Sequence, residues 1–119
     1  MKNLASEIMT SDGYIEPKAL ARMFHTTVEE VGHFTGIAVS TLKKSDRVKG
    51  VKAQTQLQSV TEIISKIIPW AGNRYLAFAW YRSEPIPAFG GRTAENLVTD
   101  GKADIVKDYI EHLALGGYA

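Results

Sequence analysis

The chain has 119 residues, a formal net charge of +1 at pH 7 and 45% hydrophobic residues, a composition typical of one globular domain or of one domain with a small accessory module. It contains no cysteine, which excludes disulfides and thiolate chemistry and fits the reducing cytoplasm in which we expect the protein. No stretch approaches the roughly 18 apolar residues of a membrane span, and the apolar run at the start is too short for a secretory signal.

Three short helices are predicted in the first part of the chain. "EPKALARMF" places Pro17 in the first turn of a helix, where its missing N–H costs nothing. "TTVEEVGHFTG" begins with Thr27 and has Glu30 three residues later, the spacing of a capping box, and it ends at Gly36. "VSTLKKS" predicts a third helix with Ser40 as its N-cap. Short helices with tight connections and a polar, basic third member are typical of a helix-turn-helix unit.

The second half of the chain is also predicted to be helical. "KAQTQLQSVTEIISKII" carries an apolar stripe from Leu57 to Ile68, Pro69 is expected to break that helix, and Asn73 is expected to cap the next. "RYLAFAWY" is apolar almost all round, so we expect it at the centre of the second half. Thr93 and Asp100 are expected to cap the last two helices.

These elements together predict an all-α fold with no convincing alternating strand pattern. We expect a helix-turn-helix-like region over residues 1–52 and a helical C-terminal domain over residues 53–119. The apolar side of the last helix is predicted to consist of Val106, Tyr109, Ile110 and Leu113.

Catalytic patterns are missing from the sequence. Gly90-Gly91 lacks the Lys-Ser/Thr that completes a phosphate-binding loop, and Asp104 and Asp108 stand on a helical face expected to be solvated, without a predicted cleft. The three histidines show none of the short spacings of metal ligands: His25, His33 and His112. We therefore expect a protein that is not an enzyme and that needs no cofactor or metal.

Positive charge is concentrated in "KKSDRVKGVK", from Lys43 to Lys52, where five of ten residues are basic. Flexible positive charge beside a helix-turn-helix suits DNA phosphates, and base reading needs side chains on the exposed side of the third helix. A solvated basic linker is the alternative, and the aromatic residues that stack single-stranded bases are missing here. The candidate DNA-binding residues are Ser40, Thr41, Lys43, Lys44, Arg47, Lys49 and Lys52.

The end of the chain resembles a known family. "IPAFGGRTAENLVTDGKADIVKDYIEHLALGGYA" is similar to the toxin-binding domain of the Xre/MbcA/ParS antitoxin family, whose pattern is a proline-bearing loop, Leu/Phe-Gly-Gly-x-Thr-Pro, a short helix and a final helix ending in Gly-x-Tyr-Ala. Ala94 replaces the usual proline, Asn96 stands near a position where an apolar residue or Glu is common, and the resemblance is specific only over residues 69–119. The positions on the pattern are Phe89, Gly90, Gly91, Arg92, Thr93, Leu97, Thr99, Gly101, Val106, Gly117, Tyr118 and Ala119.

The resemblance implies a type II antitoxin that binds and neutralises a toxin, either a RES-domain enzyme that consumes NAD or a related ADP-ribosyltransferase. It implies that the C-terminal end enters or covers the toxin's active site, where Tyr118 would be an aromatic anchor and the Ala119 carboxylate would meet a cationic pocket. The acidic side of the last helix would suit the same basic partner. The expected toxin-binding residues are Phe89, Gly90, Gly91, Arg92, Thr93, Gly116, Gly117, Tyr118 and Ala119.

Two functions stay open at this point. The first is an antitoxin that works as a homodimer within a toxin complex and represses its own operon by binding operator double-stranded DNA. The alternative is a stand-alone helix-turn-helix transcriptional regulator whose C-terminal half is a dimerisation module. Under that alternative Gly116 and Gly117 only end the last helix.

Overall fold

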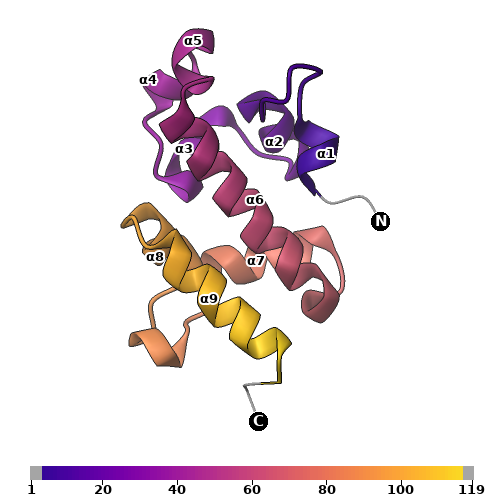
Figure 1. Ribbon diagram of the computed structural model, residues 1–119, viewed down its shortest axis with the longest axis vertical. Helices are drawn as coiled ribbons and strands as arrows, with labels where there is room; N and C mark the ends of the chain where they lie inside the picture. The colour runs from indigo at the N-terminus through magenta and orange to yellow at the C-terminus, as the bar shows by residue number, and fades with distance from the viewer. Residues whose placement is uncertain (1–3, 117–119) are drawn as a thin grey trace. The chain divides into compact units, whose positions relative to one another are not determined.

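The computed structural model of the protein describes residues 4–116, and the regular elements over that range are all helices. The all-α prediction is therefore confirmed, and no described helix is long and apolar enough to cross a membrane. Two isolated antiparallel bridges, Met9–Ile15 and Ile86–Arg92, close loops between helices. The elements in Figure 1 are α1 (Leu4–Ile8), α2 (Pro17–Met23), α3 (Val28–Thr35), α4 (Val39–Leu42), α5 (Ser45–Val48), α6 (Val51–Ala71), α7 (Arg74–Ser83), the 3-10 turn η1 (Pro87–Phe89), α8 (Ala94–Thr99) and α9 (Ala103–Ala114).

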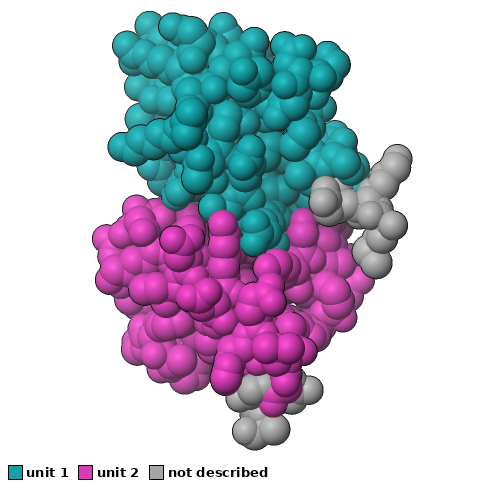
Figure 2. Space-filling view, viewed as in Figure 1, with its two compact units in different colours: residues 1–62 teal, residues 63–119 magenta. Residues whose placement is uncertain are grey.

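The chain divides into two compact units, an N-terminal unit of residues 1–62 and a C-terminal unit of residues 63–119 (Figure 2). The division falls within α6 and not after residue 52, where the sequence suggested a boundary. The difference arises because the first turns of α6 hold the N-terminal unit together. Gln54 and Gln56 on α6 both bond to the backbone of earlier residues of that unit.

The buried glutamine Gln54 ties three segments of the N-terminal unit to one another. Its Oε1 accepts the Ile15 N–H at 2.8 Å, and its Nε2 donates to the Ile15 carbonyl at 3.1 Å and to the Val48 carbonyl at 2.8 Å. The residue is only 6% exposed, so its amide is shielded from water and these bonds replace the lost hydration. Gln54 thereby fixes both the loop before α2 and the end of α5 against α6.

The contact between α3 and α4 depends on Gly32. A Cβ at this position would lie 2.8 Å from Val39 Cγ2 and 3.1 Å from the Ile37 carbonyl oxygen, so any side chain there would force these neighbours to shift. Val31 and Phe34 on α3 and Leu42 on α4 are buried in the same unit. The absence of a side chain at Gly32 therefore lets α3 and α4 pack closely. The turn between them includes Gly36, where φ is +76°.

The predicted ends of the N-terminal helices are confirmed in all but one case. Pro17 occupies the first turn of α2, the Thr27 side chain accepts the Glu30 N–H, and Gly36 ends α3 in the left-handed conformation. The prediction that Ser40 caps α4 is wrong. Ala38 is the N-cap, because the Ala38 carbonyl accepts the N–H of both Thr41 and Leu42 and the helix already includes the residue before Ser40.

The break expected at Pro69 is also misplaced, because α6 runs on to Ala71. A proline lacks only its own N–H, and the helix continues through the bond from the Gly72 N–H to the Ile68 carbonyl at 2.8 Å. The stop comes at Gly72, where φ is +110°. Asn73 then caps α7 as predicted, with its side chain accepting the N–H groups of Tyr75 and Leu76.

The prediction that residues 74–81 form the centre of the second half is wrong. Only Ala77 and Tyr81 of α7 are fully buried, while Tyr75 and Leu76 are 50% and 54% exposed. The core residues of α8 and α9 are Ala94, Leu97, Val98, Val106 and Ile110.

Asp100 does not cap α9, contrary to the sequence-based expectation. It is the C-cap of α8, and α9 begins after Lys102. Gly101, with φ of +79°, turns the chain so that the Lys102 N–H bonds back to the Leu97 carbonyl at 2.8 Å. The extra turn delays the start of α9, and the Asp100 carboxylate pairs with Arg92 at 3.3 Å and with Lys102 at 3.5 Å.

Candidate functional site

The loop of residues 86–92 is closed by its own backbone. Ile86 is buried, its N–H donates to the Arg92 carbonyl at 3.0 Å, and its carbonyl accepts the Gly91 N–H at 3.0 Å. Gly90 and Gly91 follow one another at φ of +70° and +85°, which L-residues with a Cβ rarely adopt. No atom lies within 4 Å of a Cβ built at either glycine, so the space above the pair is open. The glycines are needed for the turn itself, and they leave its backbone accessible.

Neighbouring residues hold this loop against α8 and α9. The Phe89 ring packs edge-on against Tyr109 of α9 with 5.4 Å between the centroids. The Arg92 guanidinium contacts the Asp100 carboxylate, and Thr93 forms a capping box with Asn96 at the start of α8. Of the five expected toxin-binding residues over 89–93, three are thus engaged within the unit through their side chains. The two glycines have open space where a side chain would stand, while their N–H groups bond to the Pro87 and Ile86 carbonyls.

The second group of expected toxin-binding residues lies at the end of α9. Gly116 adopts φ of +85°, and its N–H donates to the Leu113 carbonyl at 2.9 Å, so it terminates the helix. Gly117, Tyr118 and Ala119 lie outside the described residues.

A partly buried ion pair joins α7 to α8 beneath this loop. Arg82 Nε lies 2.6 Å from Glu95 Oε1, with side-chain exposures of 27% and 18%. The guanidinium also lies 5.8 Å from the centre of the Phe78 ring, an attractive cation–π distance. Beside the pair, burial raises the pKa of the Tyr81 phenol well above its usual value, and the Glu95 charge raises it further. No short-range sequence pattern indicates this pair, because its members are separated by a loop.

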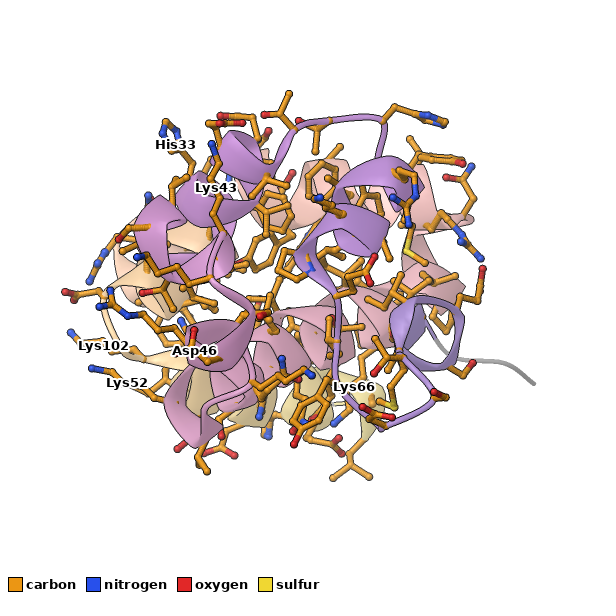
Figure 3. All side chains as sticks on the ribbon, turned by 90° about the horizontal axis from the view of Figure 1, so that it is seen from above. His33, Lys43, Asp46, Lys52, Lys66 and Lys102 are labelled. Atoms are coloured by element: carbon orange, nitrogen blue, oxygen red, sulfur yellow. The ribbon has the colours of Figure 1, made fainter. Side chains whose placement is uncertain are left out.

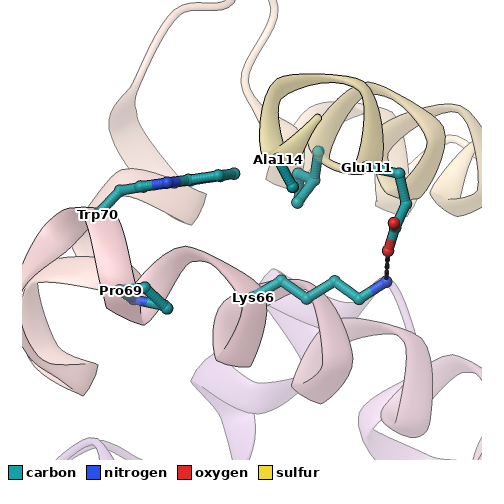
Figure 4. A pocket seen from close by; sticks show the side chains of 6 residues that line it. Lys66, Pro69, Trp70, Glu111 and Ala114 are labelled. Atoms are coloured by element: carbon teal, nitrogen blue, oxygen red, sulfur yellow. Dashed lines mark hydrogen bonds and ion pairs between the residues drawn. The ribbon is translucent and has the colours of Figure 1, made fainter. Parts of the chain in front are cut away.

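The C-terminal unit also contains a groove that the sequence analysis did not find. It has a volume of about 360 Å³ and lies between the last turns of α6 and α9 (Figure 4). Its lining residues are Lys66, Pro69, Trp70, Ile110, Glu111 and Ala114. The signal that could have found it is Trp70, a large aromatic residue directly after Pro69, near the end of the long apolar helix.

The candidate DNA-binding residues all belong to the N-terminal unit, and the structure distributes them over α4, α5, the start of α6 and the short connections between these helices. Ser40 is exposed and Thr41 is partly exposed on α4. Lys43 and Lys52 are well separated in Figure 3, with Lys43 on the side of His33. Positive charge is therefore spread along this end of the unit and not focused in one cluster.

Two of the five cations have partners within the unit. Lys43 Nζ lies 2.7 Å from Glu29 Oε2, and this hydrogen bond lowers the pKa of the Glu29 carboxyl. Lys49 Nζ lies 5.4 Å from the centre of the Tyr14 ring. The other three of these five cations are exposed and form no ion pair or ring contact with any residue in the range 4–116: Lys44, Arg47 and Lys52.

The described part of the chain holds no group of three or more His, Cys, Asp or Glu side chains able to bind a metal ion. His33, one of the three histidines, has Nδ1 3.3 Å from Glu30 Oε2 on the preceding turn of α3. Comparisons of the chain with protein-family models, with curated proteins and with solved structures gave no match.

Proposed function

We propose that the protein is the antitoxin of a type II toxin–antitoxin system and that it neutralises its toxin by direct binding through the C-terminal unit. The toxin proposed from the sequence resemblance is a NAD-consuming RES-domain enzyme or a related ADP-ribosyltransferase. The observation that carries the proposal is the closed loop of residues 86–92. It presents two successive glycines with open space above them, while Phe89 and Arg92 are held by α9 and Asp100. A loop that is already ordered loses little conformational entropy when a partner binds its backbone.

Autorepression through DNA is the second part of the proposal. It is supported by the close packing of α3 against α4 at Gly32 and by three cations that form no ion pair within the described chain, Lys44, Arg47 and Lys52. The candidate residues for DNA lie in the N-terminal unit and those for the toxin in the C-terminal unit, so the two partners would occupy different compact units. A stand-alone transcriptional regulator with a C-terminal dimerisation module is the alternative, and the same helix contact and cations favour it.

Co-expression with the product of the neighbouring gene tests the proposal. We compare the full chain, a chain lacking Gly116–Ala119, and a Gly90→Asn/Gly91→Asn variant, which puts side chains into the open space with a residue that tolerates the left-handed backbone, and we follow growth and cellular NAD. The full chain should restore both, and the loop variant should restore neither. The truncated chain shows whether the tail contributes to inhibition. A neighbour that is harmless alone and binds none of the three chains would replace the antitoxin proposal by the regulator.

A further inference from the structure

The groove between α6 and α9 has the chemistry of a site for an apolar side chain. Trp70 lies at one end of the groove, and this residue is 49% exposed. Ile110 is 1% exposed and contributes apolar surface to the lining, with Pro69 and Ala114 beside it. In Figure 4 the indole of Trp70 and the side chain of Ala114 stand on either side of the hollow.

The polar groups of the groove are already satisfied by each other. Lys66 Nζ donates to Glu111 Oε1, and this ion pair lies at the end of the groove away from Trp70 (Figure 4). Small-molecule sites usually add several convergent polar groups that fix the ligand's orientation, and besides this pair the lining side chains offer only the indole N–H of Trp70. The lining therefore suits a large aliphatic or aromatic side chain better than a polar metabolite.

The exposed side of α9 next to Glu111 is acidic. Asp104, Asp108 and Glu111 are spaced by four and three residues, so they form one stripe along the helix, and all three are exposed. Within residues 4–116, Asp104 and Asp108 form no ion pair. A partner that meets this stripe gains most if it carries lysine or arginine there.

We propose that the toxin docks a large apolar side chain into the groove between Trp70 and Ala114 and places lysine or arginine residues against Asp104 and Asp108. This inference rests on the antitoxin function and names a contact surface for it apart from the glycine loop and the tail. Buried aromatic anchors with charged neighbours usually supply a large share of the affinity of such interfaces.

The test uses the full-length chain and the purified product of the neighbouring gene. Ala114→Phe fills the groove from an exposed position in the last turn of α9, and Trp70→Ala removes one wall. Both should raise the dissociation constant at least tenfold by calorimetry. Tyr75→Ala is the matched control, because Tyr75 is equally exposed on α7 outside the groove, and it should change the constant less than twofold. Far-UV circular dichroism verifies that each variant is folded.

Two further measurements separate the possible outcomes. In a Trp80→Phe background Trp70 is the chain's remaining tryptophan, and its emission should shift to the blue when the toxin product binds. Asp104→Lys/Asp108→Lys should slow association and reverse its salt dependence. Wild-type affinity in both groove variants, with toxin binding intact, overturns the inference and leaves the antitoxin function standing. Absence of toxin binding by the wild type overturns both, and a concentration-dependent blue shift without toxin assigns the groove to a second copy of the chain.

Discussion

Gly32 shows how a single position decides the geometry of the N-terminal unit. A methyl group there meets both a side chain, at 2.8 Å from Val39 Cγ2, and a backbone oxygen of Ile37, at 3.1 Å. The side chain of Val39 can turn away, but the carbonyl can move only with the turn that joins α3 to α4.

We therefore expect Gly32→Ala to lower the free energy of unfolding by about 1–3 kcal/mol, the usual cost of overpacking a tight contact. Urea unfolding followed by circular dichroism measures the change. Ser40→Ala is the control, because Ser40 is exposed and does not cap α4, and it should change stability by less than about 0.5 kcal/mol. A loss of about 1 kcal/mol in the control would reinstate Ser40 as a cap.

The buried phenol of Tyr81 makes stability depend on alkaline pH. Its pKa is raised in the folded chain, whereas in the unfolded chain the phenol ionises near pH 10. Folding therefore favours the protonated phenol, so this contribution to stability is complete below pH 10 and is lost as the pH rises towards the folded pKa. The free energy of unfolding should begin to fall as the pH rises past about 10, the unfolded pKa, and should go on falling towards the higher folded pKa. Tyr81→Phe should flatten that fall, and an identical pH dependence in the two proteins would contradict it.

At the scale of the helices, capping residues largely determine where each helix begins and ends. The Asn73 side chain accepts two N–H groups of the first turn of α7, and Gly72 before it ends α6. Asn73→Ala should cost about 1 kcal/mol of stability, and Asn73→Asp should cost much less because aspartate caps equally well. Thermal melting of the wild type and the two variants measures these differences. Equal losses of stability in both variants would show that the Asn73 side chain does not stabilise the protein as a helix cap.

The elements that could be predicted are those defined by neighbours in sequence. Pro17, Thr27 and Asn73 mark helix starts through contacts within a few residues, so their roles follow from the sequence alone. The ends at Ser40 and Pro69 were misjudged because the competing bonds, from Leu42 to Ala38 and from Gly72 to Ile68, cannot be ranked from propensity.

The candidate sites also combine features that neighbours in sequence define with features that depend on folding. The pair Gly90-Gly91 indicates a left-handed turn from the sequence alone, and the charges of Lys44 and Arg47 indicate that these side chains are exposed. The edge-on contact of Phe89 with α9, the ion pair of Arg82 and the groove beside Trp70 each need two segments brought together by folding. Nothing in the spacing of residues along a chain specifies such pairs.

At the scale of the whole molecule, the proposal assigns DNA and the toxin to different units, and the charges of the N-terminal unit can be tested for DNA binding. If Lys44, Arg47 and Lys52 each contact a DNA phosphate, replacing all three by alanine should reduce the slope of log K against log salt by about 2.7. Lys43→Ala should change it less, because Glu29 already neutralises that charge. Lys102→Ala, a cation of the C-terminal unit, is the control. Fluorescence anisotropy with operator DNA gives the slopes, and an unchanged slope in the triple variant removes DNA from the proposal.

The hydrogen bonds of Gln54 have a consequence for how the protein is made. Ribosomes release a chain from its N-terminus, so Ile15 and Val48 emerge before the side chain that satisfies their backbone groups. Until α6 has left the exit tunnel, the first helices have no partner for these groups and stay open to chaperones and proteases. The nascent chain would thus stay vulnerable until Gln54 has emerged, and slowing translation after codon 50 should lower the yield more than slowing it near the last codons of α9.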